Sequence, residues 1–318
     1  MNFKKNTLST LVFVLIFSFN SKAQSAHMPN SKIGGVQIGL ITYSWRSMPG
    51  TAVDVIKYCQ ETGINSLELM GSVAEEYAGI PSLPNNPIEE NSSDKVKAKY
   101  KEKFDAAREK QRVWRISTSM KKYKELRKLF DEAGIDIHIV KFSPANWSDK
   151  EIDYAFKAAK VLGAVGITNE IEEDACKRLG KFAEKHDMYA IFHNHAQPGD
   201  PNFNFDKFLS YSPNNMLNLD VGHYYGATGR HPVEIIERLH DRIISLHLKD
   251  KTSKYNSDPD KNRYWGTGGT PLAEILQFIQ KNNWPIHCDI EVEYEIPEDS
   301  DALNETKNCI DFCKKALN

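Results

Sequence analysis

Two patterns of apolar residues alternate along the chain from about residue 34 onwards. Short runs rich in aliphatic and β-branched residues are typical of buried strands, and the stretches between them repeat apolar residues at helical spacing. The pattern predicts eight strands, at residues 36–43, 64–70, 135–142, 164–167, 188–193, 216–221, 243–248 and 286–292. It predicts helices at residues 51–62, 123–133, 149–162, 172–186, 232–240, 271–281 and 300–316, and a short one at 205–211.

Residues typical of helix ends support these boundaries. Ser148 stands where an N-cap is expected, and Gly63, Gly134 and Gly163 each stand between a predicted helix and the next strand. Eight strands that alternate with helices predict parallel βαβ units closed into a single (β/α)8 TIM barrel of the α/β class, over residues 34–318. No G-x-G-x-x-G follows the first strand, which argues against an open dinucleotide-binding sheet.

One connection, residues 71–134, is longer than the others. It contains a loop rich in Pro and Asn, residues 79–86, and a Lys-rich helical stretch, residues 95–112. The charges of that stretch are typical of a solvated helix face. Because the loop leaves the carboxyl end of the second strand, the catalytic side of a barrel, we expect it to act as a lid.

The N-terminus has the order of a secretory signal peptide. Lys4 and Lys5 precede an apolar run at residues 11–19, and Ser21-Lys22-Ala23 follows, before Gln24. We therefore expect residues 1–23 to be a cleaved leader and the mature protein to be periplasmic or secreted. The alternative is an uncleaved anchor, although the apolar run is short for spanning a bilayer.

The composition of the chain limits the kinds of partner that it is expected to bind. The 318-residue chain has a formal net charge of −2, which gives no electrostatic reason to bind nucleic acid or, after leader cleavage, an anionic membrane. Its five cysteines include no C-x-x-C pair, so we interpret them as buried apolar residues, without a disulfide framework or zinc site. The sequence leaves open whether the chain forms a homo-oligomer.

Polar residues collect at the ends of the later strands, where barrel enzymes place their chemistry. They are Thr168-Asn169-Glu170, His193-Asn194-His195, Asp220-Val221-Gly222-His223, His247-Leu248-Lys249-Asp250 and Asp289-Ile290-Glu291-Val292-Glu293. Strand alternation turns these acids and imidazoles inward and the intervening apolar residues towards the helices. Buried charges need partners or a metal, so the set predicts a divalent cation, Mn²⁺, Mg²⁺ or Co²⁺ and less specifically Zn²⁺.

The order Asp220-x-x-His223, His247-x-Lys249-Asp250, Glu291-x-Glu293 resembles the xylose-isomerase-like barrel family of sugar isomerases and epimerases, which includes inosose dehydratase. The resemblance extends from Ile38 to the C-terminus. It implies the metal ligands Glu170, Asp220, His247 and Glu291. It also implies acid–base roles for His195, Lys249 and Glu170, and substrate contacts for Glu68, His193, His223 and Glu293. Glu68 has a second interpretation, as a residue that supports the ligands.

One position departs from the ketose 3-epimerases of this family. They have a glutamate at the end of the fifth strand, where this chain has His193, and the run His193-Asn194-His195 is more similar to the inosose dehydratase branch. A two-glutamate epimerase mechanism is therefore in doubt.

The resemblance implies a metal-dependent sugar isomerase or epimerase that abstracts a proton next to a carbonyl through a metal-stabilised enediolate. The alternative is a lyase or hydratase of 3-keto-glycosides. Export favours a free or oxidised sugar over a sugar phosphate. Two other classes remain: a DNA-repair endonuclease, which the near-neutral charge disfavours, and a sugar-binding barrel without catalysis.

Overall fold

Eight parallel strands form a closed barrel in the computed structural model, which describes residues 28–89 and 91–318. The strands are β2 (Val36–Ile41), β3 (Ser66–Met70), β4 (Asp136–Lys141), β5 (Gly166–Glu170), β6 (Tyr189–His193), β7 (Asn215–Asp220), β8 (Ile243–Leu248) and β11 (His287–Ile290). Each pairs in parallel with the next, and β11 pairs with β2 to close the ring. A short strand, β1 (Lys32–Ile33), pairs antiparallel with β2. The predicted single (β/α)8 barrel is confirmed.

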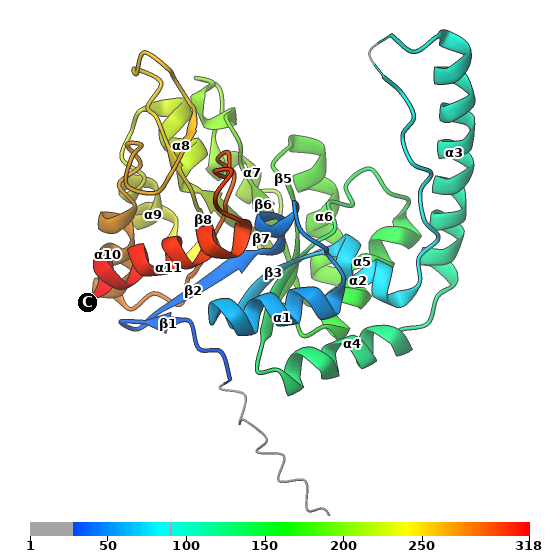
Figure 1. The fold of residues 1–318 in the computed structure, drawn as a ribbon, viewed down its shortest axis with the longest axis horizontal. Helices are drawn as coiled ribbons and strands as arrows, with labels where there is room; N and C mark the ends of the chain where they lie inside the picture. Colours follow the sequence, from blue (N-terminus) through cyan, green and yellow to red (C-terminus); the bar gives the residue numbers. More distant parts are fainter. Residues whose placement is uncertain (1–27, 90) are drawn as a thin grey trace, which may run out of the picture.

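Helices surround this barrel (Figure 1). They are α1 (Ala52–Thr62), α4 (Lys121–Glu132), α5 (Asp149–Val161), α6 (Glu173–His186), α7 (Phe205–Leu209), α9 (Val233–Leu239), α10 (Leu272–Asn282) and α11 (Ala302–Leu317). Their ends follow the expected local chemistry. Ser148 and Glu151 form a reciprocal capping box at the start of α5, and Gly63 takes the left-handed conformation, with φ of 80°, after α1.

The core lies between the barrel wall and the helices. Outward residues of the strands are fully buried there, as at Leu246 and Leu248 of β8. A second, small apolar cluster consists of Ile139, Ile191 and Met216. The alternation predicted for β8 is confirmed, since His247 and Lys249 point to the polar side of the wall, where they meet other charged groups.

Several short elements were not predicted. Helices α2 (Gly71–Ala78) and α8 (Val221–Thr228) start directly after β3 and β7, and a ribbon of β9 (Asp250–Lys251) and β10 (Asn262–Arg263) follows β8. Helix α8 is too short for a clear periodic pattern, but Asp220 caps it by accepting from the backbone N–H of His223 at 2.7 Å.

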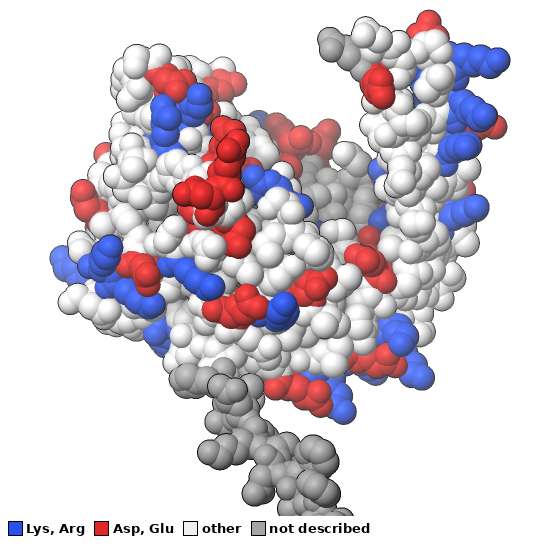
Figure 2. Space-filling view, viewed as in Figure 1, with Lys and Arg blue, Asp and Glu red and all other residues white. Residues whose placement is uncertain are grey.

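The long insertion stands beside the barrel mouth as α3 (Asp94–Ser117), with its preceding loop alongside it (Figure 1). Gln111 holds that loop by donating to the Pro81 carbonyl at 2.9 Å. The lysines of α3 are exposed, as expected of a solvated face, and basic side chains line its outer edge (Figure 2). Buried Arg115 anchors its base, 2.7 Å from Glu75 and 3.9 Å above the Trp147 ring. Closure of the 79–86 loop over the mouth stays a prediction.

The remaining expectations have different outcomes. All five cysteines are buried and free, as predicted. The predicted leader, residues 1–23, lies outside the described residues. Among the helices that the structure describes, none combines the length and apolarity needed to cross a membrane.

Candidate active site

Three of the four predicted metal ligands meet at the carboxyl ends of β7, β8 and β11. His247 is fully buried, and its Nδ1 lies 2.8 Å from Glu291 Oε2 and 4.0 Å from Asp220 Oδ2. Asp220 Oδ2 also lies 4.0 Å from His193 Nε2. Carboxylate oxygens and imidazole nitrogens from four successive regions of the barrel wall therefore surround one point.

The fourth predicted ligand, Glu170, lies at the rim of the same mouth. Its Oε1 accepts from Lys141 Nζ at 2.8 Å, and its Oε2 is 3.4 Å from His195 Nε2. Ligand atoms of Glu170, His193 and His195 all lie within 4.8 Å of one another, and His193 forms a second such group with Asp220 and His247. Glu170 thus joins the other ligands through His193.

Lys249 lies in the centre of the cluster. Its Nζ is 3.1 Å from Asp220 Oδ2, 2.9 Å from Glu291 Oε2 and 2.6 Å from Glu293 Oε2. Burial alone would lower the pKa of Lys249, but these carboxylates outweigh burial and raise the pKa above its usual value. In this arrangement the ammonium neutralises the acids that the sequence assigns to a metal.

The donor atoms fit a divalent cation. Asp220 Oδ2, His247 Nδ1 and Glu291 Oε2 are buried, and their closest charged contacts are one another and the single ammonium of Lys249. Glu170 Oε2 and His193 Nδ1 are also buried, and neither has a hydrogen bond among the described residues. Buried polar atoms are normally fully hydrogen-bonded, so a group of acids and imidazoles with so few partners is a place where a cation can bind. Carboxylate oxygen and imidazole nitrogen are the donors that Mn²⁺ and related ions accept.

The pKa values of this cluster diverge. Burial opposes charge at His247, yet Glu291 and Glu68 raise its pKa well above the usual value. Burial, with Lys141 nearby, lowers the pKa of His193 well below its usual value, and burial raises the pKa of Asp220. Because an imidazole must be deprotonated to bind a metal, occupancy of this site would release protons.

Glu68 lies beneath His247 and does not face the opening. It is fully buried, its Oε1 accepts from Thr168 at 2.6 Å, and its Oε2 accepts from Asn218 at 2.7 Å. Oε2 is also 2.5 Å from His247 Nε2. This contact turns Nδ1 towards Glu291. Of the two interpretations of Glu68, the structure favours support of a ligand over contact with a sugar.

Three of the predicted substrate and acid–base residues line the opening. The His195 side chain is 52% exposed, and its ring centroid is 5.0 Å from that of His223. His223 Nε2 is 3.9 Å from Glu293 Oε2. Burial and the nearby Lys249 lower the pKa of His223 to about 3, so this imidazole is neutral at physiological pH.

Two lysines were missed from the sequence. Lys141 ends β4 beside Glu170, and the carboxylates of Glu68 and Glu170 outweigh burial and raise its pKa. Lys251 Nζ lies 3.2 Å from His223 Nδ1 and 2.9 Å from Asp260 Oδ1. The position of Lys141 at a strand end was the signal that could have identified it, because the polar residues of later strands stand there too.

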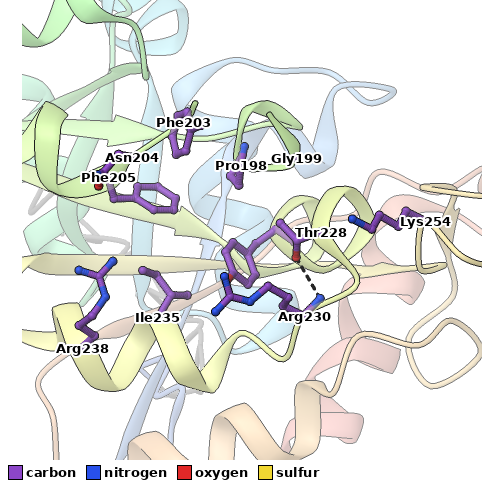
Figure 3. Close-up of a pocket in the computed structure, with 11 residues that line it drawn as sticks. Pro198, Gly199, Phe203, Asn204, Phe205, Thr228, Arg230, Ile235, Arg238 and Lys254 are labelled. Carbon is purple, nitrogen blue, oxygen red and sulfur yellow. Dashed lines mark hydrogen bonds between the residues drawn. The ribbon is translucent and has the colours of Figure 1, made fainter. Parts of the chain in front are cut away.

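Cavities of the described chain differ in their relation to this cluster. One of about 240 Å³ lies outside it, between α7, α8 and α9, and has Phe203, Phe205, Arg230 and Arg238 among its lining residues (Figure 3). It contains none of the predicted site residues. Another, of about 710 Å³, has Glu293 in its wall and therefore adjoins the cluster.

Comparison with known proteins identifies relatives of part of the chain. The inosose dehydratase of Clostridium botulinum (strain Eklund 17B / Type B) is 34% identical over 134 residues, 37% of this chain and 45% of that protein. The chain aligns with less than half the length of the curated relatives it matches.

Solved structures share the fold. A sugar phosphate isomerase/epimerase from Parabacteroides distasonis has a TM-score of 0.55 at 16% identity, covering 91% of this chain and 97% of that one. A xylose isomerase domain protein from Alicyclobacillus acidocaldarius has a TM-score of 0.59 at 14% identity, covering 89% and 98%. The family profile described as xylose isomerase-like TIM barrel matches residues 100–315. This chain therefore belongs to the xylose isomerase-like TIM barrel family.

Proposed function

We propose that this protein is a metal-dependent enzyme that removes a proton from the carbon next to a carbonyl group of a sugar. The observation that supports this most directly is the cluster of buried carboxylates and imidazoles around His247, which share one ammonium, beside an open rim that carries His195. The family of the chain and the names of its relatives point to the same class of substrate.

In this proposal Glu170, Asp220, His247 and Glu291 hold a divalent ion, with Mn²⁺ the best match to their oxygen and nitrogen donors. When bound, such an ion polarises a carbonyl and stabilises the negative charge that forms when the neighbouring proton leaves.

The side chains around it divide the proton chemistry. His195 is exposed to the opening, and Glu170 Oε2 lies 3.4 Å from its Nε2, so His195 with Glu170 is the proposed base. Lys249 also contacts Glu293, which is outside the ligand set, so its ammonium would keep this partner if Asp220 and Glu291 held a metal. There it faces the developing oxyanion or protonates it.

The step that follows proton removal separates two classes of reaction. In the first class, isomerisation, return of the proton to the opposite face gives an epimer, and return to the neighbouring carbon gives an isomer. In the second class, elimination, loss of a β-substituent gives a lyase, and the reverse reaction gives a hydratase. The position of His193 and the similarity to inosose dehydratases favour the second class, a dehydratase-like lyase or hydratase acting on 3-keto sugars or 3-keto-glycosides.

Proton exchange tests this proposal and distinguishes the reactions. The purified protein, loaded with Mn²⁺ for the incubation and freed of it before NMR, is incubated in D₂O with a panel of free and 3-keto sugars. We expect deuterium at the carbon next to the carbonyl of at least one sugar, with either a new epimer or isomer or a released β-substituent. A protein that binds Mn²⁺ and sugar yet exchanges no proton across the panel would instead be a sugar-binding barrel.

We also propose that residues 1–23 are a leader and that the mature barrel, residues 34–318, acts in the periplasm or outside the cell. The order of basic, apolar and small residues supports this. N-terminal sequencing of the protein from its native host should give Gln24 or a close neighbour. An intact Met1 on a protein of the cytoplasmic fraction would contradict it.

A further inference from the structure

We propose that the active site continues into a second carbohydrate subsite, which binds a neutral sugar unit attached to the one that reacts. The subsite is the 710 Å³ cavity formed by the segment after β9 and the loop after β11. It deepens the proposed function, on which it rests for the reacting sugar. It makes the preferred substrate a glycoside of at least two sugar units.

The size and lining of the cavity suit a small carbohydrate. Ligand sites commonly measure about 300–1,000 Å³, and this cavity lies within that range. Its lining comes from two stretches of chain, which contribute Asp260, Lys261, Asn262, Arg263 and Tyr264, and Glu293, Tyr294, Glu295, Ile296, Pro297 and Glu298.

Glu293 connects the cavity with the reacting centre. Its Oε2 accepts from Lys249 Nζ at 2.6 Å on the side of the metal ligands. On the side of the cavity, Asn262 Nδ2 lies 3.3 Å from the Glu293 carbonyl oxygen and 3.5 Å from Oε2. One side chain thus separates the two spaces, and a sugar that reaches Lys249 has its neighbouring unit beside Asn262.

Tyr264 gives the cavity an aromatic wall. Its side chain is 39% exposed, while its hydroxyl donates to the Glu295 carbonyl at 2.9 Å and its ring packs 4.5 Å from Tyr294. Tyr294 is itself buried, with its hydroxyl bonded to Glu305. The exposed ring is therefore held in place, and its electron-rich face attracts the polarised C–H bonds of a pyranose.

Charge favours a neutral unit over a phosphorylated or acidic one. The two cations of the lining have another partner, because Lys261 and Arg263 both pair with Asp258. No ion pair involves Glu295 or Glu298 among the described residues, and Figure 2 shows acidic side chains gathered over the loop between β11 and α11. An anionic ligand would meet this negative charge, whereas sugar hydroxyls can donate to it.

Asn262 connects the cavity wall with Glu293. Its Nδ2 is directed to Glu293, while its Oδ1 is buried and has no hydrogen bond among the described residues. The fixed aromatic ring and the acidic wall therefore define the chemistry of the ligand.

Binding of disaccharides tests the subsite. Cellobiose, maltose, lactose, sucrose and trehalose, and their component monosaccharides, are titrated into the Mn²⁺-loaded protein by calorimetry. We expect at least one disaccharide to bind about tenfold or more tightly than its monosaccharides. Tyr264→Ala should remove that advantage. Tyr189→Ala is the matched control, because Tyr189 is 37% exposed but starts β6 at the opposite end of the barrel.

Equal affinity for disaccharides and monosaccharides would overturn the subsite, as would equal loss in the Tyr264→Ala and Tyr189→Ala proteins. Tighter binding of glucuronic acid disaccharides or sugar phosphates would overturn its neutral chemistry. The proposed function fails separately: Asp220→Asn should abolish proton exchange and keep the advantage of the disaccharide. If the wild-type protein binds a disaccharide more tightly than its monosaccharides but exchanges no proton, the subsite is supported and the proposed reaction is refuted.

Discussion

Polar side chains lie at two levels of the barrel interior, and only one of these levels has the features of a site. At the lower level, Ser66 Oγ lies 3.0 Å from His138 Nδ1 and 2.9 Å from His287 Nδ1, and His138 Nε2 lies 2.9 Å from Asp289 Oδ2. At the upper level, around His247, the carboxylates of Asp220, Glu291 and Glu293 share the single ammonium of Lys249, and Glu170 Oε2 has no hydrogen bond among the described residues. An excess of buried acids over their partners, more than polarity, marks the place where a cation belongs.

Two strands contribute to both levels, through residues two positions apart. Strand β3 contributes Ser66 below and Glu68 above, and the β11 segment contributes Asp289 below and Glu291 above. Ligand atoms of Glu68, His247 and Asp289 lie within 4.8 Å of one another, so the levels touch. Asp289 Oδ1 is itself without a hydrogen bond, but it fills the space that a side chain at Gly39 would need, which makes its position a matter of packing.

The largest expected effect separates the two levels by the same chemical change. Asp220→Asn removes charge from the proposed ligand set, so bound Mn²⁺ and proton exchange should be lost together. Asp289→Asn is the matched control at the lower level and should keep stoichiometric metal. Elemental analysis and deuterium exchange on the same preparations measure both. Normal metal and activity in Asp220→Asn would show that the ligands lie elsewhere.

A second substitution separates binding from proton transfer within the upper level. His195→Ala removes the proposed base and leaves the ligand set, so metal content should stay normal while turnover falls by about 10²–10⁴-fold. Lys249→Met, the companion variant, should also keep its metal and lose activity, because it removes charge from the oxyanion side. Near-normal turnover of His195→Ala would make Glu170 or Glu293 the better candidate for the base.

The sequence was sufficient for the fold and for the direction of the polar side chains. Alternation of apolar and polar residues identified all eight barrel strands and turned His247 inward. The edges were less accurate: strand β11 ends at Ile290, two residues before the predicted end, because the chain leaves regular pairing as the Val292 N–H donates to Ser44 Oγ at 3.0 Å. Such tertiary contacts leave no periodic signal.

Alternation cannot distinguish the two levels, since inward parity is the same for Ser66 and Glu68. The depth of a side chain along the barrel axis depends on the register between neighbouring strands. The pairing of β3 with β4 shifts after Leu67, which changes this depth locally. For this reason the sequence alone did not decide whether Glu68 contacts a sugar or supports a metal ligand. It also assigned Lys249 no contact with the ligands, although its ammonium lies between Asp220 and Glu291.

Glu68 tests whether the levels are mechanically joined. Glu68→Gln keeps the size of the side chain and removes the charge that orients His247, so Mn²⁺ affinity should fall about 10–100-fold without loss of fold. Competition titration against a chelator measures the affinity, and circular dichroism verifies the fold. Rescue of part of the affinity by Glu68→Asp would support the orienting role. Unchanged affinity in Glu68→Gln would mean that His247 is fixed by its other contacts.

The smallest expected effect belongs to the lower level and concerns stability alone. Burial, and then the nearby His138, lower the pKa of His287 to about 2, well below the unfolded value of about 6.5. Below about pH 6.5 the unfolded chain takes up a proton at this residue and the folded chain does not. This residue's contribution to the free energy of unfolding is therefore full above that pH and falls towards pH 2, by at most about 1.4 kcal/mol per pH unit.

His287→Asn should therefore flatten the decline of stability with acidity while metal binding at neutral pH stays normal. Urea denaturation of the metal-free protein at pH 7.5, 6.5, 5.5 and 4.5 gives the free energy of unfolding for the wild type and the variant. His240→Asn, at an exposed position, controls for the loss of an imidazole. If the free energy of unfolding of the wild type and of His287→Asn changes with pH in the same way, His287 takes up its proton as a solvated imidazole does, and the prediction is wrong. A flatter curve in His287→Asn, with the His240→Asn curve parallel to the wild type, would assign the acid sensitivity to the satisfied layer beneath the site.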